Sequence, residues 1–156
     1  MKKPGSTSDF ISTRDRELYA NFIQLLRNSE LPLKDMFGAA AKMACSRFWV
    51  SERHAAEVIS CMRRNADPER VERMYGQKRA MYCEILRRVE QLMERQPELC
   101  LQHAVDAVVC GEAPEFYLTG KSARVIIYRH RRKLRETRKE AERKNAAARK
   151  ALGFTL

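Results

Sequence analysis

The side chains best suited to binding a polyanion are concentrated near the C-terminal end of the sequence. Residues 121–150 include 13 Lys or Arg and three Glu, whereas the rest of the chain has 18 basic and 17 acidic residues. Nearly all of the net charge of +11 therefore belongs to this one segment. Lysine and arginine displace counterions from phosphates, and arginine also makes bidentate hydrogen bonds with guanine. Such a one-sided charge run predicts a polyanionic partner, nucleic acid above all.

A helix is expected to position these basic side chains. Ala123, Ile126, Ile127 and Leu134 recur at helical spacing and form the predicted inner face, so the residues between them point outward. Beyond Leu134 the apolar residues are mostly alanines, and we expect this part to protrude or to fray without a partner. The candidate nucleic-acid-binding residues are Lys121, Arg124, Tyr128, Arg129, Arg131, Arg132, Lys133, Arg135, Arg138 and Lys139.

Metal binding and catalysis have weaker support. Cys100, His103 and Cys110 are a poor zinc set, because no C-x2-C pair occurs and Cys45 or Cys61 would have to supply the fourth ligand. The sequence has no glycine-rich phosphate loop and no H-E-x-x-H motif. We therefore expect no metal and no cofactor, and we predict that the protein is not an enzyme.

One stretch of the sequence occurs twice. Residues 47–64, RFWVSERHAAEVISCMRR, align without a gap to residues 115–132, EFYLTGKSARVIIYRHRR. Each copy has two aromatic residues, an aliphatic residue, a hydroxyl residue and then helical apolar spacing. Ser51 and Thr119 are the predicted N-caps of the two helices, because a hydroxyl oxygen accepts a hydrogen bond from the first free backbone N–H groups.

The aromatic pairs of the two copies are Phe48 with Trp49 and Phe116 with Tyr117. We expect Phe48 and Phe116 to be buried at equivalent positions. Trp49 and Tyr117 then face the other way. They can stack on bases, or they can cover a neighbouring element, which is the more common role of such a pair.

The similarity between the copies continues upstream. Residues 18–26 match residues 81–89 at an offset of 63, and residues 32–45 match residues 97–110 at an offset of 65. The doubled stretch itself matches at an offset of 68. Insertions that fall between elements indicate a duplicated structural unit, so we expect residues 14–64 and 78–132 to form similar three-helix units.

The sequence as a whole predicts an all-α protein of two tandem tri-helical, helix-turn-helix-like repeats with a long basic C-terminal helix. Asn65 to Pro68 is the clearest break, because proline disfavours helix in the residue before it. The expected parts are a flexible leader (1–13), repeat 1 (14–64), a linker (65–77), repeat 2 (78–133) and a basic helical extension and tail (134–156).

The Ala-rich second helix, the short turn and the capped third helix resemble the helix-turn-helix class of DNA-binding proteins, whose recognition helix enters the major groove. The turn ACSRFWVS (44–51) is longer than the tight turn of that class. The RFWVSERHAA motif (47–56) also resembles small basic proteins of bacterial mobile elements, and no function is carried over from that likeness.

These features predict a nucleic-acid-binding protein that prefers duplex DNA and acts in regulation or in the handling of mobile DNA. The third helix of repeat 2 and its extension are expected to bind. Repeat 1 has Glu52 and Glu57 on its outer face, so it is expected to support repeat 2 or to form a homodimer. Two alternatives stay open: an RNA-binding protein, and an adaptor that docks its basic helix on an acidic protein.

The expected location is the cytoplasm, without membrane contact. No run approaches the roughly 18 apolar residues of a membrane span, and the Met-Lys-Lys start lacks the apolar stretch of a secretory signal. Five cysteines, an odd number without tight pairing, favour reduced thiols.

Overall fold

The computed structural model describes residues 7–74 and 76–153. Throughout these residues the regular secondary structure is helical, which confirms the predicted all-α class. A single isolated antiparallel bridge, between Cys45 and Ala113, is the extent of β pairing in this part of the chain. The helices are α1 (Thr7–Asn28), α2 (Leu33–Ala41), α3 (Glu52–Arg64), α4 (Pro68–Glu72), α5 (Gly76–Arg95), α6 (Leu101–Val109) and α7 (Gly120–Ala151).

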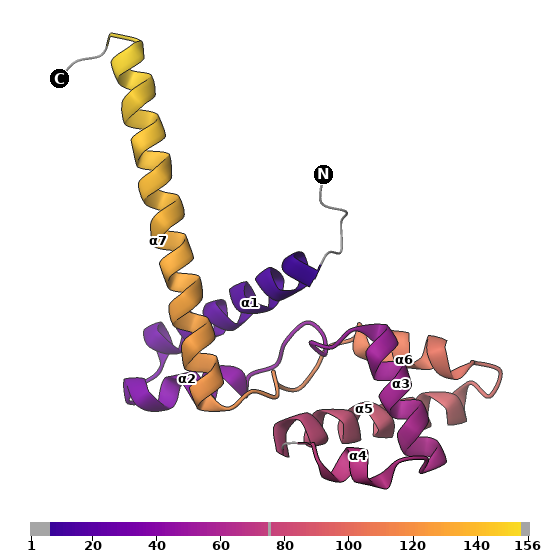
Figure 1. Cartoon of the computed structure of the whole chain (residues 1–156). Coiled ribbons are helices and arrows are strands. Elements are labelled where there is room, and N and C mark those ends of the chain that lie inside the picture. Colours follow the sequence, from indigo (N-terminus) through magenta and orange to yellow (C-terminus); the bar gives the residue numbers. More distant parts are fainter. Residues whose placement is uncertain (1–6, 75, 154–156) are drawn as a thin grey trace.

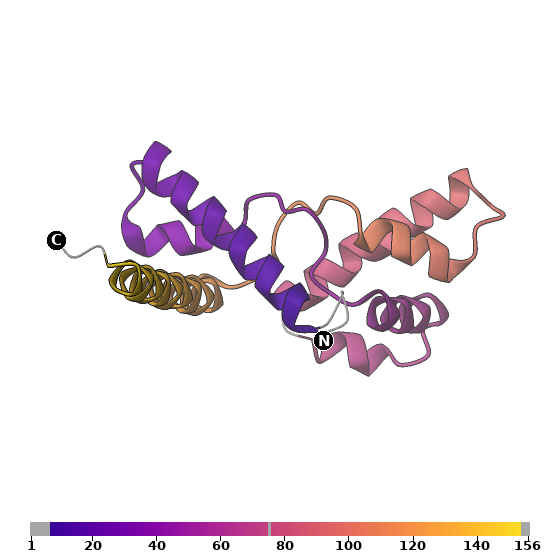
Figure 2. The ribbon, with the colours of Figure 1, turned by 90° about the horizontal axis from the view of Figure 1, so that it is seen from above.

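All of these helices except the short α4 form two three-helix bundles (Figures 1 and 2). Helices α1, α2 and α7 pack together as the α7 bundle, and helices α3, α5 and α6 pack together as the α3 bundle. The third helix of each repeat therefore packs on the first two helices of the other repeat. The order of helices within the repeats matches the expectation. The packing differs from the expected tandem units, because the two repeats exchange their third helices.

Two linkers, residues 42–51 and 110–119, carry out this exchange where they cross between the bundles. Cys45 and Ala113 donate backbone hydrogen bonds to each other's carbonyl oxygens, both 3.0 Å long. The Cys45 thiol adds bonds to the carbonyl oxygens of Arg47 (3.2 Å) and Glu115 (3.3 Å). Burial and the charge of Glu17 raise the pKa of Cys45 to about 12. The thiol therefore stays protonated and can donate hydrogen bonds to both linkers.

Each linker also donates a hydrogen bond to the C-terminal end of the second helix of the opposite repeat. The Phe48 N–H donates to the Val109 oxygen at the end of α6 (3.0 Å), and the Phe116 N–H donates to the Ala41 oxygen at the end of α2 (2.8 Å). Helix C-termini leave carbonyl groups without an intrahelical partner, and these two bonds satisfy one on each side. Both phenylalanine rings are buried, as predicted.

The structure corrects the pairing of the second helices. Helices α2 and α6 each have nine residues, and they begin 68 positions apart. Their buried residues follow the same spacing: Met36, Phe37, Ala40 and Ala41 in α2, and Ala104, Val105, Val108 and Val109 in α6. The predicted offset of 65 is wrong by three residues. A shift of three or four residues keeps a side chain near the same helical face, so the apolar pattern alone accepts both alignments.

The first helices show the same ambiguity. Helices α1 and α5 end at Asn28 and Arg95, 67 positions apart. Counted from those ends, buried Leu18 corresponds to buried Ile85 rather than to Met81. The predicted offset of 63 therefore differs from the structural one by four residues, which is about one helical turn.

The predicted leader is partly helical, because α1 begins at Thr7, inside the range 1–13. Residues 1–6 lie outside the described residues. The early part of α1 has tertiary partners: the Phe10 ring meets the Trp49 ring edge-on with centroids 5.2 Å apart, and the Arg47 guanidinium lies 4.9 Å from the Phe10 centroid. These contacts to the first linker extend the helix beyond the repeat predicted from apolar spacing.

The third helices differ in length because their ends differ. Ser51 and Thr119 accept backbone hydrogen bonds as the predicted N-caps of α3 and α7. Helix α3 stops at Arg64, where Asn65 takes a left-handed conformation with φ 49°, and the short helix α4 follows within the predicted linker. Helix α7 meets no such signal and runs on to Ala151. The end of the predicted tail, residues 154–156, lies outside the described residues.

Removal of either buried linker ring should destabilise the whole protein. Phe48→Ala and Phe116→Ala should each lower the free energy of unfolding by about 3–5 kcal/mol, since each leaves a cavity at the crossing. Leu152→Ala is the control, because this side chain is 74% exposed, and its expected effect is within about 0.5 kcal/mol. Urea unfolding followed by circular dichroism gives these values. Equal stability of all three variants would contradict the role of the rings.

The helix exchange can be tested by cutting the chain in the α3–α4 connection. Fragments 1–66 and 67–156 each lack the third helix that their first two helices pack against. We expect neither fragment to unfold cooperatively alone, because Val58 and Ile59 of α3 would lose their burial. An equimolar mixture should form a one-to-one complex with the helix content of the intact protein. A stable monomeric fold of fragment 1–66 would contradict the exchange.

Candidate nucleic-acid interface

Helix α7 has an anchored part and a projecting part. Ala123, Ile126 and Ile127 are buried against α1 and α2. From Arg131 to Ala151 every residue is exposed, and Figure 1 shows this part extending away from both bundles. Twenty-one residues correspond to about 30 Å of helix at ~1.5 Å per residue. The prediction of a protruding extension agrees with this arrangement, and the extension is helical. It begins earlier than predicted, because Leu134, which was expected on the inner face, is 46% exposed.

Seven predicted site residues line one side of α7, at separations that place them on the same helical face. All seven are exposed, and the described residues offer no ion-pair partner to the six basic members. We call this set the basic stripe. It consists of Lys121, Arg124, Tyr128, Arg131, Arg132, Arg135 and Lys139.

An aromatic contact holds the beginning of the basic stripe against α2. The Tyr128 ring lies 5.5 Å from the Phe37 ring, and the Arg124 guanidinium lies 5.6 Å from the Tyr128 centroid and 5.9 Å from the Phe37 centroid. A cation over an aromatic face is attracted by the ring quadrupole. Phe37 thus orders two members of the stripe, while Tyr128 keeps 41% of its surface exposed.

Helix α2 adds a cation that the sequence analysis did not single out. A groove of about 320 Å³ lies between α2 and α7, and Lys34 lines it together with Leu33, Lys121 and Arg124. We call it the α2–α7 groove. The two helices approach closely at a pair of glycines, since a Cβ on Gly120 would lie 3.5 Å from the Gly38 backbone. Only the exchange of third helices brings Lys34 beside the stripe.

Arg129, another predicted site residue, holds α7 to α1. It donates to Oδ2 of Asp15 at 2.9 Å, and Arg14 donates to Oδ1 at 2.9 Å. The Asp15 side chain is 3% exposed, and it is the one buried charged residue among the described side chains. Lys133, one helical turn later, lies on the same side of α7 as Arg129. These two residues therefore belong to the face toward α1.

The acidic residues of the extension do not cancel its charge. Arg138, the one predicted site residue not yet described, pairs with Glu142 at 3.1 Å, and Lys144 pairs with Glu140 at 2.9 Å. All four side chains are more than 60% exposed. Exposed pairs of this kind contribute only about 0.3–0.5 kcal/mol each and are screened by salt, so a polyanion can displace them.

Trp49 and Tyr117 lie against neighbouring elements of the protein, away from the stripe. Trp49 packs on Phe10, and the Tyr117 ring stacks on the Phe48 ring with centroids 6.0 Å apart. Burial together with the charges of Glu84 and Glu115 raises the pKa of Tyr117 to about 12. Of the two roles predicted for these rings, base stacking and covering a neighbouring element, both rings take the second.

The cysteines are dispersed. Cys100 precedes the first residue of α6 and Cys110 follows its last, so the helix separates them. Cys110 donates to Oε1 of Glu52, and the buried Cys45 thiol is engaged at the crossing. Across the described ranges, no group of three His, Cys, Asp or Glu side chains gathers in a metal-binding arrangement. In the same residues, no helix has the length and apolar character needed to cross a membrane.

Comparison of the chain with protein-family models, with curated proteins and with solved structures finds no match. A functional assignment has to come from the geometry and charge of the molecule itself.

The free energy of unfolding can test whether Arg129 contributes to the packing of α7 while Arg132 of the basic stripe does not. Arg129→Gln should lower the free energy of unfolding by about 1–3 kcal/mol, because it removes a hydrogen bond to a buried carboxylate. Arg132→Gln removes an exposed charge and should change it by less than about 0.5 kcal/mol. Urea titration of the two variants measures the difference. Equal effects would mean that the Asp15 pair contributes nothing to holding α7.

Proposed function

We propose that this protein is a non-enzymatic nucleic-acid-binding protein that binds duplex DNA along the basic stripe of α7. The observation that carries the proposal is a long exposed helix face whose cations have no acidic partner in the described part of the chain. A charge of this density is costly to concentrate on one element without a polyanion to neutralise it. Each phosphate contact releases counterions and favours binding.

The dimensions of α7 support duplex DNA. From Lys121 to Lys139 the stripe is about 27 Å long at ~1.5 Å per residue, which matches roughly eight base pairs at ~3.4 Å each. The major groove of B-form DNA is about 12 Å wide and admits an α-helix. The major groove of A-form RNA is deep and narrow, and side chains cannot read it. This difference favours DNA over RNA.

The pairing of α2 with α7 supports the same proposal. In helix-turn-helix proteins the recognition helix reads bases with its N-terminal residues, while the preceding helix crosses the backbone. Here Lys121 and Arg124 lie near the N-terminus of α7, and Lys34 lies near the N-terminus of α2. The resemblance noted in the sequence therefore applies best to α2 with α7, two helices far apart in the chain. Lys34 and the α7 extension are suited to phosphates, and Arg124 is suited to a base edge.

The salt dependence of binding tests this proposal. Replacing Arg131, Arg132 and Arg135 together with Gln keeps helix propensity and removes three charges from the stripe. Affinity for all duplex sequences should fall. The slope of log affinity against log salt should flatten by up to about 2.7 units, since each neutralised phosphate contributes about 0.9. Fluorescence anisotropy with a labelled duplex at several salt concentrations measures both.

A matched variant controls for the loss of net charge. Arg63, Arg73 and Arg87 each pair with a glutamate elsewhere on the surface, and their replacement with Gln should leave the salt slope unchanged. Structured RNA and single strands are titrated alongside the duplex. Tighter binding of RNA at equal salt would replace DNA by RNA in the proposal. Absence of binding to every nucleic acid at low salt would reject it and favour an acidic protein partner.

A further inference from the structure

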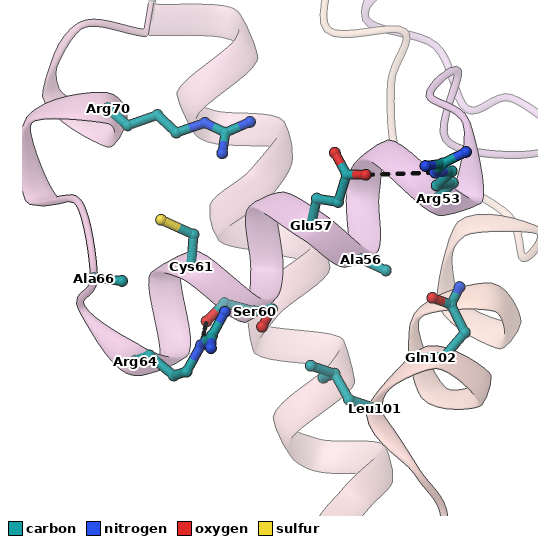
Figure 3. Close-up of a pocket in the computed structure, with 10 residues that line it drawn as sticks. All are labelled: Arg53, Ala56, Glu57, Ser60, Cys61, Arg64, Ala66, Arg70, Leu101 and Gln102. Atoms are coloured by element: carbon teal, nitrogen blue, oxygen red, sulfur yellow. Dashed lines mark hydrogen bonds and ion pairs between the residues drawn. The ribbon is translucent and has the colours of Figure 1, made fainter.

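The α3 bundle contains a second groove at the position that corresponds to the α2–α7 groove. In this bundle α6 takes the place of α2, and α3 takes the place of α7. Helices α2 and α6 begin 68 positions apart, and so do α3 and α7. The groove has a volume of about 680 Å³ and lies between α3, α4 and the beginning of α6 (Figure 3). We call it the α3–α6 groove.

The two grooves are lined by equivalent residues. Both lie where the start of the second helix meets the outer face of the third helix. Five pairs of lining residues occupy equivalent positions of the repeats: Leu33 and Leu101, Lys34 and Gln102, Lys121 and Arg53, Arg124 and Ala56, and Tyr128 and Ser60. The exchange of helices has thus produced two copies of one surface feature within a single chain.

The α3–α6 groove is positively charged. Its charged lining residues are Arg53, Arg64, Arg70 and Glu57. Figure 3 shows Arg53 and Arg64 at the two ends of the groove along α3, with Arg70 reaching in from α4. Glu57 pairs with Arg53 at 3.5 Å, and the Arg64 Nε donates to the Ser60 carbonyl oxygen at 3.3 Å. Within the described residues, Arg70 makes no hydrogen bond or ion pair through its side chain.

Nucleic-acid backbone is the ligand that best fits this groove. Guanidinium groups bind phosphate oxygens with paired N–H donors, and the Ser60 hydroxyl adds a donor among the lining residues. The groove is open to solvent along α3 rather than closed over, which suits a segment of a polymer. Glu57 opposes an anion and makes this groove the weaker of the two.

We infer that the α3–α6 groove is a second nucleic-acid-binding site, which holds the phosphodiester backbone of a second duplex segment. This inference rests on the proposed function and extends it: one chain presents two related DNA-binding faces, as a two-fold symmetric dimer does. It also assigns binding to repeat 1, which the sequence analysis expected only to support or dimerise.

Stoichiometry with a short duplex tests the inference. A GC-rich duplex of about ten base pairs is roughly 34 Å long at ~3.4 Å per base pair, a little longer than the basic stripe of about 27 Å. At low salt the intact protein should bind two such duplexes, seen by native mass spectrometry and isothermal titration calorimetry. Replacement of Arg53, Arg64 and Arg70 with Gln should reduce the ratio to one. The triple variant of Arg63, Arg73 and Arg87 is matched in charge and should still bind two.

A single substitution should strengthen binding at the α3–α6 groove instead of weakening it. Glu57→Gln removes the acidic residue and frees Arg53, so the second duplex should bind at least several-fold more tightly while the first is unaffected. One duplex per intact chain, or two duplexes per chain in the Arg53, Arg64 and Arg70 variant, would overturn the inference and leave the proposed function standing. No binding of the duplex by the intact protein would reject the proposed function itself.

Discussion

The crossing of the two linkers is the constraint on which the rest of the structure depends. Cys45 and Ala113 pair through two backbone hydrogen bonds, and Phe48 and Phe116 then close the second helices of opposite repeats. These bonds are reciprocal, so neither linker can take this path without the other. Once they are formed, each third helix is directed to the other repeat's first two helices. The two bundles therefore share their stability.

The two third helices have diverged on this common frame. Helix α3 ends after 13 residues at left-handed Asn65, and its outer face has a glutamate among its arginines. Helix α7 continues for 32 residues and leaves its second half without a protein partner in the described residues. The stronger positive surface and the free length thus belong to the same helix. This division suits one principal and one auxiliary contact with a polyanion.

Charge on α7 has two separate uses. On the side toward α1, Arg129 meets the buried Asp15 carboxylate, and this interaction is part of the packing. On the side toward α2, the cations of the basic stripe are exposed, and Phe37 orders Arg124 and Tyr128 by ring contacts. Residues of the same type, a few positions apart, are distinguished by what the neighbouring helix presents to them. Composition alone treats them as equal.

The sequence by itself determined the helices, their capping residues and the one-sided charge of the last helix, because these depend on local spacing and on side chains near each helix end. Ser51, Thr119, the buried pair Phe48 and Phe116, and the projecting end of α7 follow from such patterns, although the projection begins before Leu134. The apolar pattern aligns the first and second helices of the two repeats about one turn away from their structural correspondence, since a helical face repeats every three or four residues. Only the tertiary structure decided which helices pack together. The apolar spacing of a third helix does not specify which repeat it packs on, whereas the backbone hydrogen bonds of the two linkers join each linker to the opposite repeat. The same choice brought Lys34 to the basic stripe, placed Asp15 against Arg129 and built the α3–α6 groove, because each of these requires residues from both repeats to meet.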